Sequence, residues 1–230
     1  MPCKKFDVQV EFIVKEIIYF LFLKLVVRFR PEAALGVKGK KRWSYMHAAV
    51  LRKSLRSIKL LLDHHVSINL QDFNGRTPLM MTAVVYEDSI ARFLLEHDAL
   101  STIQDHKGYS VAHWAVQEGN VKLLELLAEQ ESFNNLIHLN DEQGIHIIQL
   151  ASILGHNIML QKIIDHNADV NVQDKAGFTA LHYAAARNDT ETCNLLLEAG
   201  ADIKILDKKK RAPYKYAKNS ALKQILEKGY

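Results

Sequence analysis

The sequence predicts an all-α solenoid, in which about six helix-turn-helix units follow one another along the chain. Three observations predict this fold. The 230 residues are 48% apolar and 24% charged, which is enough for a buried core and excludes a disordered chain. A short sequence pattern returns at a nearly constant interval. Each copy starts with a helix-capping residue and continues into a second apolar run.

The first 38 residues precede the repeats and are apolar and basic. Phe6 to Phe29 is rich in bulky apolar residues, but its longest uncharged stretch, Ile17 to Leu23, is far shorter than the ~20 residues that span a bilayer. Three alternatives stay open for this segment. It is a helix or strand that covers the next unit, a secretory signal or membrane anchor within residues 6–29, or a segment poorly ordered outside its natural context.

The repeat is visible in four long matches. The segment Asp174 to Ala185 is echoed by Asp72 to Ala83, Asp105 to Val116 and Asp141 to Ser152. The position held by threonine in the best copies marks the phase, and it falls at Ser44, Thr77, Ser110, His146, Thr179 and Ala212. The spacings are 33, 33, 36, 33 and 33 residues, so the phase persists along most of the chain.

The residues of one unit explain its helices. The hydroxyl of Thr179 can cap a helix, and Pro78 suits a first helical turn because its missing N–H costs nothing there. The turn after the second helix requires a positive φ, which Gly200 provides and Asn167 tolerates. One unit cannot bury its apolar face alone, so the units must stack and the ends need caps. Residues 213–226 fit a C-terminal cap.

These copies resemble the ankyrin repeat, whose pattern is D-x-x-G-x-T-P-L-H-x-A followed by a second helix. The resemblance covers residues 39 to about 228 and implies an ankyrin-repeat domain over 39–230. It also implies that each unit begins with a β-turn finger and that fingers and inner helices bind a partner protein. The expected units are about 39–71, 72–104, 105–140, 141–173, 174–206 and a cap at 207–230.

The third unit is three residues longer than the others, and the extra residues fall between Glu131 and Asn140. Such an insertion usually forms a surface loop, because the entropy of closing a loop grows slowly with its length. The sharper alternative is a functional protrusion that carries Phe133 and Leu136.

Catalytic, metal and cofactor sites are not predicted. Most of the eleven histidines recur with the repeat, and the resemblance implies that His47, His113 and His182 bond the local turn. The chain has two cysteines, of which Cys193 lies in an apolar helix and is assigned to packing. No metalloprotease, phosphate-loop, dinucleotide-binding or serine-hydrolase motif occurs, so we expect a protein that is not an enzyme.

An aspartate begins each finger, and its side chain can bond nearby backbone donors, so a turn-forming role is predicted for the whole set. The set is Asp72, Asp105, Asp141, Asp174 and Asp207.

Charge is distributed unevenly. Residues 1–43 carry +6, residues 44–206 carry −8 and residues 207–230 carry +6. Two basic runs can serve as nuclear-import signals or anion-binding patches, or else are solvated charge beside a finger. They comprise Lys38, Lys40, Lys41 and Arg42, and Lys208, Lys209, Lys210 and Arg211. The acidic middle argues against direct nucleic-acid binding.

The resemblance implies a partner-binding column at the finger position before the phase marker. It consists of Trp43, Arg76, Tyr109, Ile145, Phe178 and Arg211. Aromatic and arginine side chains are typical of binding hot spots. The fingertip residue Phe73 and residues at the inner-helix ends extend this surface, namely Val84, Val85, Glu118, Ile153, Leu154 and Arg187. The four apolar members indicate an interface, or else pack under the fingers.

The predicted function is therefore a non-catalytic adaptor or inhibitor that binds another protein through its fingertips and concave inner-helix face. We expect a monomer in the cytoplasm, the nucleus or both, acting in the regulation of signalling. The alternative is a membrane-associated or secreted protein that residues 6–29 target.

Overall fold

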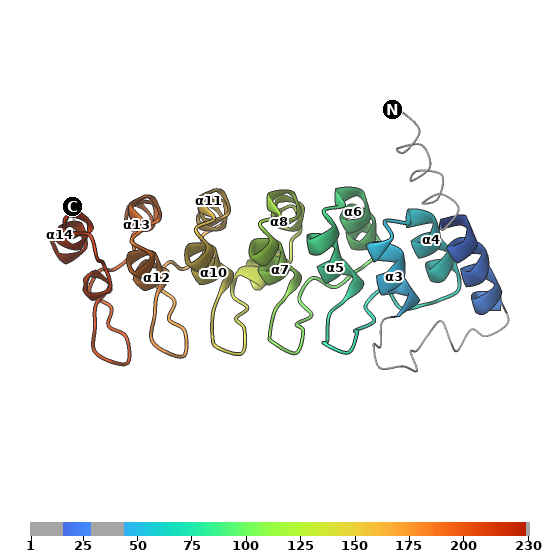
Figure 1. Cartoon of the computed structure of the whole chain (residues 1–230), viewed down its shortest axis with the longest axis horizontal. Coiled ribbons are helices and arrows are strands. Elements are labelled where there is room, and N and C mark those ends of the chain that lie inside the picture. Colours follow the sequence, from blue (N-terminus) through green and yellow to red (C-terminus); the bar gives the residue numbers. More distant parts are fainter. Residues whose placement is uncertain (1–15, 29–43, 229–230) are drawn as a thin grey trace, which may run out of the picture. The chain divides into compact units, whose positions relative to one another are not determined.

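The computed structural model describes residues 16–28 and 44–228, and its helices are shown in Figure 1. Within these ranges every extended regular element is a helix, as the sequence predicts. Internal contacts divide the chain into two compact parts. We call them the first body, Met1–Leu100, and the second body, Ser101–Tyr230, and describe each by itself.

The first body contains two helical pairs and a preceding helix. α3 packs against both α4 and α5, and α5 packs against α6. Their bounds are α3 Tyr45–Leu51, α4 Leu55–Asp63, α5 Pro78–Val85 and α6 Asp88–Glu96, with the preceding helix at residues 16–28. The first helices of the two pairs, α3 and α5, form the inner row, which lies next to the fingers in Figure 1.

The second body repeats this plan three times and ends in a cap. The inner helices α7, α10 and α12 pack in sequence, and the outer helices α8, α11 and α13 pack behind them. The bounds are α7 Val111–Glu118, α8 Val121–Ala128, α9 Phe133–Ile137, α10 Ile147–Leu154, α11 Asn157–Asp165, α12 Ala180–Arg187, α13 Thr190–Glu198, η1 Pro213–Lys215 and α14 Ser220–Lys228. The 3-10 helix η1 contacts both α12 and α14 and closes the stack.

The predicted helix starts and turns are confirmed. Thr179 and Thr77 cap α12 and α5, and Pro78 occupies the first turn of α5. The turns after the outer helices adopt positive φ, with values of 59° at Asn167 and 88° at Gly200. Left-handed backbone of this kind ends helices and favours glycine or asparagine, as both residues show.

The insertion in the third unit does not form a protrusion. Its residues fold into the short helix α9, in which Phe133 is 2% exposed and Leu136 is fully buried. The Phe133 ring meets the His166 ring edge to face at 4.9 Å between centroids. The prediction of a functional protrusion carrying Phe133 and Leu136 is therefore wrong, because these apolar side chains gain more from burial against α11 than from exposure.

Part of the apolar N-terminal segment packs onto the first body. Helix 16–28 buries Phe20, Leu23 and Val27, and the Arg56 guanidinium lies 4.0 Å from the centre of the Phe20 ring. Its other side exposes five apolar residues, Ile17, Ile18, Leu21, Phe22 and Leu25. In the described part of the chain, no helix has the length and apolarity needed to cross a bilayer. The rest of the segment, residues 1–15 and 29–38, lies outside the described residues.

Candidate functional site

Each finger is folded around the carboxylate of its first aspartate. In all five described fingers, one carboxylate oxygen accepts backbone N–H groups from the residues two and four positions later. These bonds are 2.8–2.9 Å long. The five aspartates are buried, so the turn-forming role predicted for them is confirmed.

The second carboxylate oxygen binds a side chain that differs between fingers. Arg76 donates to Asp72, and Trp114 Nε1 donates to Asp105 at 3.0 Å. The Tyr183 hydroxyl donates to Asp174 in the same way. Burial and the neighbouring carboxylate therefore raise the pKa of Tyr183 well above its usual range. The bonds from Trp114 and Tyr183 tie their fingers to the inner helices α7 and α12, whereas the bond from Arg76 lies within its own finger.

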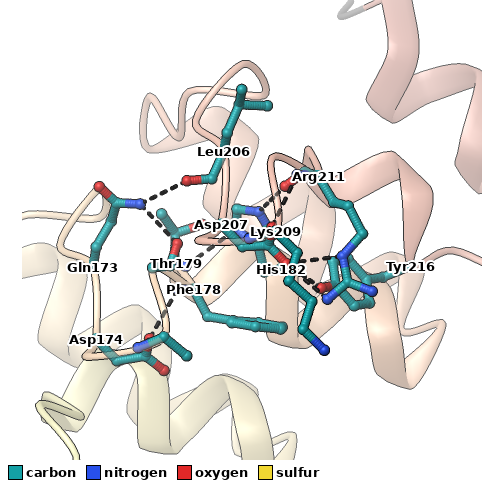
Figure 2. Close-up of polar contacts among 12 residues, drawn as sticks. Gln173, Asp174, Phe178, Thr179, His182, Leu206, Asp207, Lys209, Arg211 and Tyr216 are labelled. Carbon is teal, nitrogen blue, oxygen red and sulfur yellow. Dashed lines mark hydrogen bonds and ion pairs between the residues drawn. The ribbon is translucent and has the colours of Figure 1, made fainter.

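The last finger repeats this geometry with an additional donor. Asp207 accepts bonds from the Tyr216 hydroxyl and from Arg211 Nη2 at 2.9 Å, as Figure 2 shows. Burial alone would raise the pKa of Asp207, but the hydrogen bonds from Tyr216, Arg211 and the Lys209 backbone outweigh it and hold the pKa well below its usual range. The Asp207 charge is thus compensated within the finger.

Backbone bonds connect successive fingers of the second body. Glu142 N donates to Lys107 O at 3.0 Å, and Lys175 N and Lys208 N repeat this bond to the carbonyls of Gln143 and Ala176. The contact leaves no room for a side chain at the glycine of the preceding finger, because a Cβ on Gly177 would lie 2.9 Å from Lys208 N. The fingers therefore form a ladder with a fixed geometry.

Glutamine side chains reinforce this ladder. Gln173 Nε2 donates to Gly177 O in its own finger at 2.7 Å and to Leu206 O in the next at 3.1 Å (Figure 2). Gln104 makes the equivalent pair of bonds to Gly108 O and Asn140 O. The prediction from sequence overlooked both glutamines, although their position one residue before the finger aspartate repeats.

Histidines at the fourth position of the repeat pattern join neighbouring units. Ser110 N donates to His113 Nδ1, so the ring carries its proton on Nε2, which donates to Ile145 O at 3.2 Å. Burial lowers the pKa of His113 from 6.5 to about 4, and it also lowers the pKa of His47 and His182. These neutral rings bond the local turn, as the resemblance implies, and also reach the next finger. Gln149 replaces histidine in one unit and donates to Phe178 O.

The side chains of the predicted partner-binding column are only partly exposed. Arg76, Tyr109, Ile145, Phe178 and Arg211 are half-buried, while Trp43 lies outside the described residues. The two aromatic rings lie against the inner helices. Tyr109 stacks on His113 at 5.3 Å between centroids, and Phe178 lies 5.1 Å from the Tyr216 ring.

The remaining predicted binding residues differ in exposure. In the first body, Phe73 is 44% and Val84 is 39% exposed, whereas Val85 is half-buried. In the second body, Arg187 is exposed and its guanidinium donates to Ile153 O at 2.9 Å. Three further members of the predicted surface are half-buried there, namely Glu118, Ile153 and Leu154.

Only one of the two basic runs lies within the described residues. Lys38, Lys40, Lys41 and Arg42 lie outside the described residues. Lys208, Lys209 and Lys210 are exposed on the last finger, while Arg211 is bound to Asp207.

Cys193 is fully buried and burial raises its pKa to about 12, so it is a packing residue as predicted. Residues 16–28 and 44–228 contain no cluster of three metal-ligating side chains.

Comparison with known proteins decides the family. A family model described as ankyrin repeats (3 copies) matches residues 45–138 and 131–207. The chain belongs to the ankyrin-repeat family. Its fold is similar to the crystal structure of the ankyrin repeat domain of Bcl-3, with a TM-score of 0.78 and 24% sequence identity over 89% of this chain and 91% of that one.

Curated ankyrin-containing relatives are longer proteins. The chain is 30% identical over 155 residues to the chicken (Gallus gallus) nuclear factor NF-kappa-B p105 subunit, covering 66% of this chain and 16% of the relative. It is 27% identical over 206 residues to a putative ankyrin repeat protein of fowlpox virus, covering 78% and 34%. It is also 27% identical to the palmitoyltransferase AKR1 of Lachancea kluyveri, covering 70% and 22%. The chain thus spans about a third or less of these relatives.

The last ankyrin finger departs from the earlier ones at two positions. Leu206 stands where the preceding finger has Gln173, and Lys210 stands where it has Gly177. Lys210 keeps the left-handed backbone of the glycines, with a φ of 58°. Both residues line a surface hollow of about 300 Å³ between this finger and the cap. We did not predict this hollow from the sequence, although the two departures from the repeat pattern mark it.

Proposed function

We propose that this ankyrin chain is a non-catalytic adaptor or inhibitor that binds a partner protein through its fingertips and inner-helix ends. The observation that carries the proposal is the rigid finger ladder of the second body, held by the bond from Lys175 N to Gln143 O and its equivalents. A surface fixed before binding loses little conformational entropy when a partner docks, so shape can supply affinity.

The exposed apolar side chains are the proposed contact points. Phe73 is 44% exposed at a fingertip and Val84 is 39% exposed at the end of the inner helix α5, so both are accessible to a partner. Tyr109 and Phe178 offer ring edges but also pack on the inner helices. We therefore assign the strongest contacts to the exposed members rather than to the column aromatics.

The proposed cellular role and location rest on the similarity to relatives. We propose that the chain acts in signalling in the cytoplasm, the nucleus or both, and the support is the similarity to the NF-kappa-B p105 subunit over 66% of this chain. We also propose that it is a monomer. The basic runs at Lys38 to Arg42 and Lys208 to Arg211 remain predicted nuclear-import signals or anion-binding patches.

Affinity capture from cell extract with matched variants tests the partner surface. Phe73→Ser/Val84→Ser removes exposed apolar surface at the finger and inner-helix end, and the control Leu100→Ser/Ile158→Ser removes it elsewhere, where these side chains are 55% and 67% exposed. We expect proteins captured by the unaltered chain to be lost with the first variant and kept with the control. Loss with both variants, or with neither, contradicts the proposed surface.

A second candidate function is membrane association through residues 6–29. It is favoured by the five apolar side chains that helix 16–28 exposes. Cell fractionation of the full chain against a version that starts at Glu32 tests it. A shift of the shortened chain from membranes to the soluble fraction supports this candidate, and an identical distribution removes it.

A further inference from the structure

The last finger carries a side chain, that of Lys210, at a position where the finger before it accommodates only glycine. A Cβ on Gly177 would approach Lys208 N to 2.9 Å, and one on Gly108 would approach Asp141 Cα to 2.7 Å. The following finger thus dictates glycine at these positions. Among the described residues no finger packs against Lys210, and Lys210 is exposed.

Lys210 nevertheless keeps the backbone that glycine prefers. Its φ of 58° lies in the left-handed region, which costs a residue with a Cβ free energy that glycine does not lose. Lys210 is exposed and is one of the residues that line the hollow.

The hollow combines an apolar floor with a basic rim. It lies between the last finger, η1 and α14 and has a volume of about 300 Å³. We call it the lysine-rimmed hollow, and define it by Leu206, Tyr214 and Leu226 in the floor and Lys204, Lys210 and Lys215 in the rim. Leu206 is 49% exposed, so it offers apolar surface to a ligand in the hollow. One carboxylate, that of Glu227, also lines the hollow.

Charge in the surrounding sequence is strongly positive. Residues 208–228 carry eight lysines and arginines and one acidic residue. Asp207 and Arg211 neutralise each other within the finger, so residues 207–230 keep a net charge of +6. An approaching anionic group is therefore attracted to this end of the second body.

The last finger also has a backbone carbonyl that continues the pattern of the ladder. The carbonyls of Lys107, Gln143 and Ala176 each accept an N–H from the next finger. The equivalent carbonyl in the last finger is that of Lys209, and it accepts no backbone bond from the residues that the structure describes. A polypeptide segment can supply the missing N–H, whereas a free phosphate ester or a lipid headgroup phosphate cannot.

We propose that the lysine-rimmed hollow docks a short acidic segment of a partner protein that carries one bulky apolar side chain. The apolar side chain enters between Leu206 and Tyr214, the flanking carboxylates meet the rim lysines, and a backbone N–H bonds the Lys209 carbonyl. A nucleic acid fits less well. Its length would carry phosphates toward residues 44–206, which have a net charge of −8. This inference does not depend on the partner surface proposed above.

Selection from a random peptide library displayed on phage tests the proposal with the full chain as bait. We expect enrichment of peptides that combine acidic residues with one bulky apolar residue. The decisive variant is Leu206→Gln/Lys210→Gly, which installs the residues of the preceding finger and should fold with a melting temperature no lower than that of the unaltered protein. Loss of one apolar contact and one charge pair should weaken an enriched peptide about tenfold in fluorescence anisotropy.

Two control variants and an oligonucleotide competitor separate the outcomes. Lys107→Ala removes a charge from an interior finger and should leave peptide affinity within about twofold. Phe73→Ser/Val84→Ser should also bind the peptide unchanged, so failure of the proposed function is distinguishable from failure of this inference. The proposal is overturned if the enriched peptides lack acidic residues, if Leu206→Gln/Lys210→Gly binds as tightly as the unaltered chain, or if an oligonucleotide competes as well as the peptide does.

Discussion

The finger of the fifth unit begins at Asp174, and we call it the fifth finger. It has the same internal geometry as the last finger, which begins at Asp207, but different surroundings. In both, an aspartate accepts two backbone N–H groups and a tyrosine hydroxyl from nine residues later. The fifth finger has another finger against it, through the bond from Lys208 N to Ala176 O. The last finger faces the cap and the hollow instead.

The difference shows what a neighbour imposes on a repeat. Contact with the next finger requires Gly177, and the bridging bond to Leu206 O requires Gln173. The aspartate network is internal, so it persists in both fingers. In the last finger these two positions have no neighbouring finger among the described residues, and they carry Lys210 and Leu206. Both residues line the hollow at this end of the second body.

The exchange of the two finger residues is expected to give the largest effect. Gly177→Lys should destabilise the second body by roughly 2–4 kcal/mol, because it adds left-handed strain and a Cβ contact with Lys208 N. Lys210→Gly should leave stability unchanged or raise it by up to about 1 kcal/mol. Urea unfolding of both variants measures this asymmetry. If Gly177→Lys were tolerated as well as Lys210→Gly, the neighbour would not be the cause.

Removal of the tyrosine hydroxyls is expected to lower the free energy of unfolding by an intermediate amount. Tyr183→Phe should cost about 1.5 kcal/mol, since it removes a hydrogen bond to a carboxylate. Tyr216→Phe should cost less, because Arg211 also donates to Asp207, with Nε at 3.0 Å and Nη2 at 2.9 Å. Chemical denaturation ranks the two variants. The reverse order would show that Arg211 does not support the last finger.

The histidine links give the smallest expected effect. The unfolded chain binds a proton near pH 6.5, whereas burial keeps His113 neutral until about pH 4, so stability should fall as the pH drops between these values. The loss should be about 1.4 kcal/mol at about pH 5.5. His113→Gln should flatten this dependence, because Gln149 makes the same kind of bond in the next unit.

A matched variant at the last finger completes that test. His182 donates to Arg211 O at 3.1 Å, and burial lowers its pKa too, so His182→Gln should change the pH dependence in the same direction. His138→Gln, which replaces an exposed imidazole, is the matched control. Denaturation at several pH values measures all three variants. An unchanged profile for His113→Gln would refute the role given to the buried neutral ring.

Sequence alone predicted the features that repeat and missed those that do not. The phase markers located the caps at Thr77 and Thr179, and the aspartate pattern located the turns, because each depends on bonds within a few residues. The fate of Phe133 was mispredicted, since its burial depends on the outer helix of the next unit. The lysine-rimmed hollow was missed because Leu206, Tyr214 and Leu226 come from separate segments that only the fold brings together.

The central claim is that the end of the stack is a binding end. The most direct test is an NMR titration of the isotopically labelled chain with an acidic peptide enriched in the library selection. The account predicts that the amide resonances of Leu206, Lys210 and Tyr214 shift, while those of the interior fingertips, such as Lys107 and Lys175, do not. Shifts confined to the interior fingers, or no shifts at all, would contradict it.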